Sequence, residues 1–357
     1  MSCSNFDGIA ITGLAAAVPS RKIDNLVPTE TFSAEDAAAI VEKTGIRFRR
    51  WADSTTCASD LCFSAAGRLL REMEVDRNAF DAVIFVSQTP DYRMPATAFL
   101  LQDRLGLSNN TAAFDVNLGC SGYIQGLMLA FSIASVSQYG RVLLLNGETR
   151  TRAYSFRDKA TGLLFGDAGT ATLVERNQKA GKSYFSINSD GARADFIKIP
   201  SGGYRNPSDG ESIIEKLQAD GGFRSDEHGT MNGPGVFEFL ITEVPEDIKT
   251  ILKKSGCNQN DINHFIFHQA NQFMNEYLRK KMKISAEKVP YSLEHFGNTS
   301  SVSIPLTMVT RLSNTLKAKK SKVMLAGFGV GLSWGSAIAD VGPIHVSDLI
   351  ELKAASV

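Results

Sequence analysis

The chain has 357 residues and a formal net charge of zero, with 43% apolar and 21% charged residues. This composition is typical of a globular protein with two domains or one large duplicated one, and it gives no support for bulk nucleic-acid binding. No run approaches the roughly 18 apolar residues of a membrane span, and the start resembles no signal peptide. The five cysteines lack metal-ligand spacing, so we expect reduced thiols in a cytoplasmic protein without a metal site.

Apolar patterning in the first half predicts alternating strands and helices. A strand over 8–17 precedes a loop over 19–25. Ser33 occupies the N-cap position of a helix that ends at Gly45. The remaining elements predicted for this half are a helix over 58–74, a strand over 82–87, a turn over 89–95, a helix ending at 105, strands over 112–116 and 141–146, and a hairpin-like segment over 166–175.

Cys120 lies on a predicted turn between an apolar run over 112–116 and an apolar helix that follows Gly122. The run is expected to be a buried strand, and Gly119 and Gly122 allow a tight bend. Because a helix N-terminus favours an anion, the thiol should ionise more easily than a free cysteine. On this turn alone, a nucleophile and a small cysteine packed under a helix are equally well supported.

The segment over 176–234 is rich in Gly, Ser, Asn and Asp, and we expect it to bridge the two halves of the chain. Its parts at 195–200 and 202–203 are expected to line or cover the entrance to a site. A helix over 231–252 follows, and Pro245 is predicted to interrupt it.

Three segments of the first half recur about 180 residues later, in the same order: 81–88 at 263–270, 118–121 at 296–299, and 141–145 at 322–326. This indicates a duplicated α/β unit, although helix–strand units can also recur by chance. We place the halves at 1–178, with the nucleophile, and 179–357. Equivalent turns of such halves meet near a pseudo-twofold axis, so Cys120, His268 and Asn298 are predicted to converge.

These three side chains support acyl-transfer chemistry. A cysteine thiolate attacks a thioester and holds its acyl group covalently. A His268 N–H and an Asn298 amide N–H aimed at one oxygen form an oxyanion hole, which can stabilise the enolate left when a malonyl thioester loses carbon dioxide. The glycine-rich run 327–335 can serve a second oxyanion, and it lacks the features of a P-loop or a dinucleotide site.

Together the motifs resemble the thiolase superfamily and, within it, the ketoacyl-ACP synthase III family. They span nearly the whole chain, at 44–47, 115–122, 165–169, 268–271, 297–305 and 327–335. The resemblance implies a five-layered αβαβα fold, a homodimer, acyl transfer to Cys120, and malonyl decarboxylation assisted by His268 and Asn298. It also implies that the N–H groups of Cys120 and Val330 bind the acyl oxyanion, and that Met94 reaches the acyl pocket of the partner subunit.

Three positions depart from the family pattern, and at one of them Phe273 stands where the family has a basic residue just after the motif at 268–271. Where fatty-acid-initiating members sandwich the adenine of coenzyme A between Trp and Arg, this chain has Ala39 and Lys159. Acyl-CoA and an acyl-carrier phosphopantetheine thioester both stay candidate substrates, the carrier form being favoured, and we expect no permanently bound cofactor. A basic patch could dock an acidic acyl carrier protein, or it could be a solvated face; its members are Arg279, Lys280 and Lys281.

Three alternatives remain open at this point. A related acyltransferase could pass the acyl group to an alcohol or amine, with His268 as general base, or join two acyl chains. A catalytically silent partner subunit would usually lack the nucleophile or its partners. A papain-like hydrolase shares the order Cys, His, Asn, but its local signature at the cysteine is absent here.

Overall fold

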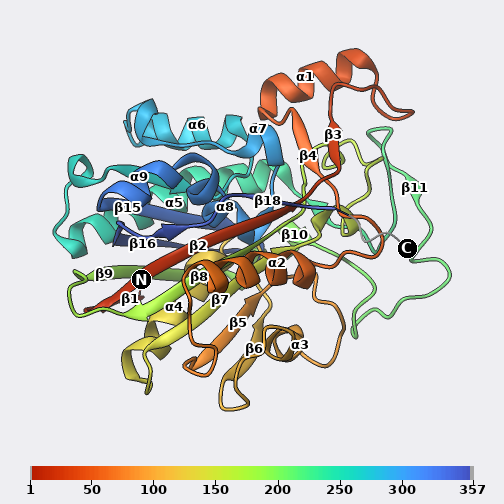
Figure 1. Ribbon diagram of the computed structural model, residues 1–357. Helices are drawn as coiled ribbons and strands as arrows, with labels where there is room; N and C mark the ends of the chain where they lie inside the picture. Colours follow the sequence, from red (N-terminus) through yellow and green to blue (C-terminus); the bar gives the residue numbers. More distant parts are fainter. Residues whose placement is uncertain (1, 354–357) are drawn as a thin grey trace.

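The computed structural model describes residues 2–353 and is built on two large β-sheets with helices between and outside them (Figure 1). The first sheet consists of β2 (Ile9–Pro19), β5 (Ala82–Val86), β6 (Ala112–Val116), β7 (Arg141–Glu148), β8 (Ala168–Arg176), β17 (His345–Val346) and β18 (Ile350–Leu352). Its order is β17-β2-β8-β7-β5-β6, and β18 also pairs with β2. β5 runs parallel to β6 and β7, whereas β8 is antiparallel to β7 and β2.

The second sheet consists of β1 (Ser2–Phe6), β9 (Ser183–Ser189), β14 (His264–Phe267), β15 (Ser321–Gly329) and β16 (Ser333–Val341). Its order is β1-β9-β16-β15-β14, with β14 parallel to β15 and β16 antiparallel to β15 and β9. Two-stranded ribbons pair β3 (Lys22–Asp24) with β4 (Phe48–Arg50), β10 (Ile197–Lys198) with β13 (Thr230–Met231), and β11 (Lys216–Leu217) with β12 (Phe223–Arg224).

Three buried apolar clusters fix how the helices cover the sheets. The helices are α1 (Ala34–Thr44), α2 (Ala58–Glu72), α3 (Thr97–Arg104), α4 (Gly122–Val136), α5 (Gly233–Ser255), α6 (Gln272–Lys281), α7 (Leu293–Phe296), α8 (Ser303–Arg311) and α9 (Ser313–Ala318). α2 and α3 cover the outer face of the first sheet, and α5 and α6 cover that of the second. α4 and α8 share one cluster with strands of both sheets, so they lie between them. This αβαβα layering confirms the predicted fold class.

Buried strands carry apolar side chains on both faces because helices cover both faces. In β5, Val83 and Phe85 pack against the outer helices, whereas Ile84 and Val86 belong to the cluster between the sheets. All five residues of β5 are buried. A near-continuous apolar run in the sequence therefore marks a strand at the centre of such a sheet.

The two sheets repeat the same strand arrangement, as the internal repeat predicted. Ala82 of β5 is paired with Val142 of β7, and His264 of β14 with Val323 of β15, which lie 182 and 181 positions further along the chain. In each sheet the next strand is antiparallel to this parallel pair. The duplication is therefore visible in the strand register.

Both ends of the described chain cross between the halves. β1 pairs with β9 in the second sheet, and β17 and β18 pair with β2 in the first. The predicted boundary between 178 and 179 lies between β8 and β9, and it stays a prediction. The exchange of terminal strands ties the sheets together.

Several local predictions are wrong. β3 occupies part of the predicted loop over 19–25, and the hairpin-like segment over 166–175 is the single strand β8. β6 has the predicted bounds but forms the sheet edge and is partly exposed, because only β5 pairs with it. The bridging segment over 176–234 contains β9, an inner strand of the second sheet. Its polar composition concealed that strand.

α5 continues through Pro245 instead of breaking there. A proline removes the N–H that would bond to the carbonyl four residues earlier, here that of Ile241. Lys281 of α6 supplies a replacement, because its Nζ donates to Ile241 O at 2.5 Å. A donor from the neighbouring helix thus helps the helix to continue, and it accounts for one of the three basic residues considered for carrier docking.

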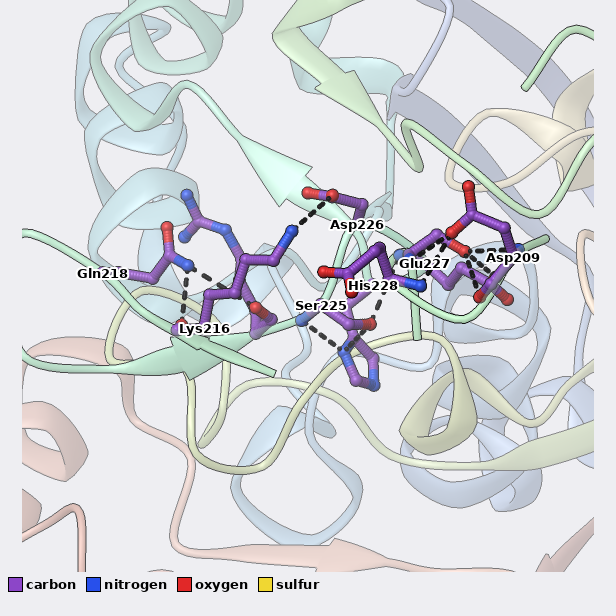
Figure 2. Close-up of polar contacts among 10 residues, drawn as sticks. Asp209, Lys216, Gln218, Ser225, Asp226, Glu227 and His228 are labelled. Carbon is purple, nitrogen blue, oxygen red and sulfur yellow. Dashed lines mark hydrogen bonds and ion pairs between the residues drawn. The ribbon is translucent and has the colours of Figure 1, made fainter. Parts of the chain in front are cut away.

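The segment between β10 and β13 is held together by contacts among its own polar side chains (Figure 2). Glu227 accepts a hydrogen bond from Ser212 Oγ at 2.6 Å. At the two ends of the segment, Ile197 and Met231 are paired across the β10–β13 ribbon, and both line the cavity described below. Among residues 2–353, every helix is too short or too polar to cross a membrane.

Candidate active site

Cys120 lies on the turn between β6 and α4, directly before the N-cap residue Ser121. The end of β15 passes so close to this turn that a Cβ on Gly329 would lie 2.6 Å from the Cys120 Cβ, and one on Gly327 would lie 3.0 Å from the Ser121 Cα. Only glycine permits that approach. Ser121 Oγ also lies 2.6 Å from Ser333 Oγ, which fixes the turn against the second sheet.

Cys120, His268 and Asn298 line one cavity, as the sequence predicted. The cysteine comes from the first half, and the other two come from turns that follow β14 and α7 in the second half. The Cys120 sulfur also lies 3.8 Å from Ser300 Oγ. The cavity, of about 60 Å³, is narrow at this end of the site.

His268 is buried and uncharged at neutral pH. Burial, with a smaller contribution from the positive charge of Arg150, lowers its pKa to about 3. Its Nδ1 lies 2.8 Å from Ser303 Oγ, which accepts the backbone N–H of Gln269 at 3.3 Å. With one lone pair of Ser303 Oγ in use, we assign its proton to Nδ1 and the imidazole proton to Nε2, and the Ser303→Ala variant tests this assignment. His268 is thus arranged as a neutral donor.

Asn298 is fixed in one orientation by the backbone around it. Its Oδ1 accepts the N–H of Ser300 at 2.9 Å, so Nδ2 is the donor end, and one of its two N–H groups donates to Ala270 O at 3.4 Å. Its own backbone is held by Leu164 and Gly166 of the first half, through N–H···O distances of 2.9 and 3.1 Å. The motif at 165–169 therefore positions the asparagine turn.

The Cys120 thiol is harder to ionise than a free one. Burial raises its pKa, although the Arg150 guanidinium, the Ser300 hydroxyl and the Val330 N–H favour the thiolate. The prediction that the helix start would make the thiol more acidic is therefore wrong, because removal from water outweighs these contributions. Val330 nevertheless lines the same cavity as Cys120, where the predicted second oxyanion would form.

A second and wider cavity continues outward from the first. Its volume is about 440 Å³, and the two share lining residues that include Leu164, Val236 and Asn271. Lys159 lines this outer cavity together with Lys43, whereas Ala39 lies on a neighbouring groove. The pair of cavities forms a path from the surface to the sulfur.

The remaining predicted residues lie outside both cavities. Met94 has 76% of its surface exposed, which leaves it available to a partner subunit. Arg279 forms an ion pair with Glu276 at 2.7 Å and donates to Ile284 O at 2.7 Å. Arg279 thus has a structural role, as Lys281 does, and the docking prediction stays untested.

Sequence reasoning missed three residues at the site: Arg150, Tyr154 and Ser303. Arg150 lies in a Thr-Arg-Thr-Arg run that is typical of an exposed surface, yet it lines the Cys120 cavity with Tyr154. Ser303 was recognised only as part of the family motif at 297–305. The one signal in the sequence for such residues is a polar side chain close to the end of an apolar strand. That signal is weak, because many surface residues share it.

Two duplicated sheets around a central helix layer, with a cysteine from one half and His and Asn from the other, define a thiolase-fold acyltransferase. Two family models match the chain: 3-oxoacyl-[acyl-carrier-protein (ACP)] synthase III at residues 114–191, and its C-terminal model at residues 252–341. A putative 3-oxoacyl-[acyl-carrier-protein] synthase 3 of Campylobacter jejuni is 32% identical over 351 residues, covering 97% of this chain and 98% of that protein. The chain belongs to the 3-oxoacyl-[acyl-carrier-protein] synthase III family.

Other similar proteins agree with this assignment. The beta-ketoacyl-[acyl-carrier-protein] synthase III of Natranaerobius thermophilus is 33% identical over 325 residues, covering 87% of this chain and 95% of that protein. The crystal structure of a 3-oxoacyl-(acyl-carrier protein) synthase from Burkholderia xenovorans has a TM-score of 0.92 and 40% identity, covering 98% of this chain and 99% of that one. The similarity extends over both halves.

Proposed function

We propose that this chain moves an acyl group from a thioester to Cys120 and condenses it with a malonyl thioester on a carrier protein. One observation carries the proposal: Cys120, His268 and Asn298 line a single cavity. There the two partner side chains present N–H donors, and neither presents a strong base. Family membership supports the same reaction.

The first step forms the acyl-enzyme. The Cys120 thiolate attacks the donor carbonyl, and the carbonyl oxygen becomes an oxyanion. When the oxyanion collapses, the carbon–sulfur bond to the donor breaks, and the departing donor thiolate takes up the proton that Cys120 released. The N–H groups of Cys120 and Val330 are the proposed donors to that oxyanion. The presence of Val330 and Cys120 on the wall of one cavity supports this role.

The second step generates and uses a carbanion. The thioester carbonyl of the malonyl group accepts hydrogen bonds from His268 Nε2 and Asn298 Nδ2, so the enolate formed when carbon dioxide leaves is stabilised. The enolate carbon attacks the acyl carbonyl on Cys120, and the thiolate departs with the bonding electrons. No metal is needed for this sequence of steps.

The alternative in which His268 acts as a general base toward an alcohol or amine is less well supported. A general base is most effective when its pKa lies near the working pH. Burial lowers the pKa of His268 to about 3, which makes it a poor base and a suitable neutral donor. Decarboxylative condensation uses the donor function.

The finer parts of the proposal concern the substrate carrier and the assembly. The outer cavity can admit a phosphopantetheine arm, with Lys43 and Lys159 at its wall for an acidic carrier. Among the described residues β6 pairs with a strand on one side only, and α3 packs beside it. Phe99 of α3 and Met94, which precedes this helix, are exposed, which supports a homodimer joined along this edge. Five free cysteines agree with work in the reducing cytoplasm.

The test separates the two steps. Intact-protein mass spectrometry after incubation with a panel of acyl thioesters should show one acyl adduct, which Cys120→Ala abolishes. His268→Ala and Asn298→Ala should still form the adduct but lose malonyl decarboxylation by at least 100-fold. Loss of the adduct in these two variants, despite unchanged folding, would contradict the assignment.

A further inference from the structure

Arg150 is a buried cation on the wall of the Cys120 cavity. It begins the short 3₁₀ turn Arg150–Arg152 directly after the β7 region, and only 4% of its surface is exposed. Its guanidinium donates to Gln88 Oε1 at 3.3 Å and to Tyr154 OH at 3.2 Å, and both acceptors are neutral. Its Nε has no hydrogen-bond partner within residues 2–353. Most of its five N–H donors are therefore unused.

The described part of the chain supplies no ion-pair partner for this guanidinium. Glu148 is buried nearby, but its carboxyl oxygens accept from the Gln88 N–H and from the hydroxyls of Thr89 and Ser301, at 3.2–3.3 Å. Burial also raises the pKa of Glu148, which favours its neutral form. An unpaired buried charge is unfavourable. A ligand that brings a negative charge into the cavity would therefore be stabilised by Arg150.

We propose that Arg150 binds the carboxylate of a short thioester substrate in the Cys120 cavity, an inference that rests on the proposed function. The planar guanidinium fork matches a carboxylate with two parallel hydrogen bonds. The rings of Tyr154 and Phe165, 5.2 and 5.7 Å from the cation, restrict its position. The narrow cavity limits the substrate to a few atoms beyond the reacting carbonyl.

Two substrates can bring this carboxylate. One is an acyl donor derived from a short dicarboxylic acid, whose far carboxylate would reach Arg150 once the acyl group is on Cys120. The other is the malonyl extender, whose carboxylate is present until decarboxylation. Both share the same chemistry at Arg150, and they act in different steps.

The variants are Arg150→Gln, which removes the charge, and Arg150→Lys, which keeps a charge without the fork. Arg152→Gln is the matched control, because that guanidinium belongs to the same turn and donates to the carbonyl groups of Asp53 and Thr56. Thermal melting checks that each variant folds. The wild type gives a second comparison that needs no variant: acylation by a succinyl thioester against its uncharged succinamoyl analogue.

In the donor arm, intact-protein mass spectrometry follows acylation of Cys120 by succinyl and butyryl pantetheine thioesters. In the extender arm, carbon dioxide release gives the KM for a malonyl thioester. Loss of the charge also disfavours the Cys120 thiolate, so butyryl transfer in the same variant measures that shared effect. Beyond it, Arg150→Gln should weaken one of these carboxylate substrates at least a further tenfold, and Arg152→Gln should change neither. The arm that responds identifies which substrate brings the carboxylate.

Equal losses for charged and neutral donors would overturn the inference, since Arg150 would then act on the thiol or on folding. Unchanged kinetics of Arg150→Gln in both arms would overturn it as well. The same holds if the wild type is acylated equally fast by succinyl and succinamoyl donors and Arg150→Gln has an unchanged KM for the malonyl thioester. If no thioester labels Cys120 in the wild type, the proposed function fails first. If butyryl thioester labels Cys120 but these results are negative, the inference about Arg150 fails and the proposed function stands.

Discussion

Replacing Ser303 with alanine tests whether His268 acts as a donor through Nε2. The serine hydroxyl lies 2.8 Å from Nδ1 and is the group that directs the imidazole proton to Nε2. Both residues are buried, so the variant leaves Nδ1 without a partner. A buried polar group left unsatisfied costs about 1–3 kcal/mol. Since about 1.36 kcal/mol corresponds to a tenfold rate change, decarboxylation should fall roughly 5- to 150-fold.

The assay compares malonyl decarboxylation with acylation of Cys120 in the same preparation. Acylation should change little, because the Cys120 and Val330 N–H groups do not depend on His268. Ser292→Ala is a matched control: it removes a buried hydroxyl contact of similar length, 2.7 Å to Thr307 Oγ1, on the same helix layer. If Ser303→Ala slowed both steps equally, or if Ser292→Ala gave the same selective loss, the assigned orientation of the imidazole would be wrong.

Two further outcomes follow from the packing of the site. Because burial lowers the folded-state pKa of His268 from 6.5 to about 3, the unfolded chain binds an extra proton below pH 6.5. Between pH 7 and pH 5 the free energy of unfolding of the wild type should therefore fall by about 2 kcal/mol through this group. In His268→Gln this part of the decrease should be absent when urea unfolding is measured at each pH. An equal decrease in the two proteins would contradict the burial argument. Gly166→Ala should lower stability by roughly 1–3 kcal/mol and reduce decarboxylation, since its Cβ would overlap the backbone carbonyl of Phe296; an unchanged melting temperature would show that the contact is not tight.

The residues predicted to form the site share a local signature that sequence can carry. Cys120 and Asn298 each lie on a turn of small residues between apolar segments, and His268 directly follows a buried strand. Because the halves repeat, equivalent turns were expected to meet, and the cavity brings all three together. Their individual catalytic roles stay predictions.

The partners of these residues could not be predicted, because they depend on contacts between distant segments. Ser303 is 35 residues from His268, and nothing in either motif states that they touch. Arg150 looks like a surface residue until the fold turns it into the cavity. The same limit explains the error at Pro245, where a lysine of a neighbouring helix bonds the carbonyl that the proline leaves free.

Elements buried on both faces were predictable, whereas exposed or polar strands were not. β5 is apolar throughout and was found within one residue of its end. β9 reads Ser-Tyr-Phe-Ser-Ile-Asn-Ser and was taken for part of a linker, although it pairs with β1 and β16. Its Ser186 and Asn188 are tolerated because both donate hydrogen bonds to Asp247 of α5, which a single-strand pattern cannot show.

One physical cause, burial, sets the charge of the whole site. It raises the pKa of Cys120 and of Glu148 and lowers that of His268, so thiol, carboxyl and imidazole all tend toward neutral forms. Arg150 keeps its charge at neutral pH, because the pKa of a guanidinium lies far above 7 even when the group is buried. In a medium of low dielectric one uncompensated cation has a long reach. The same field therefore favours the thiolate, each oxyanion and a substrate carboxylate, while it opposes conversion of His268 to the imidazolium.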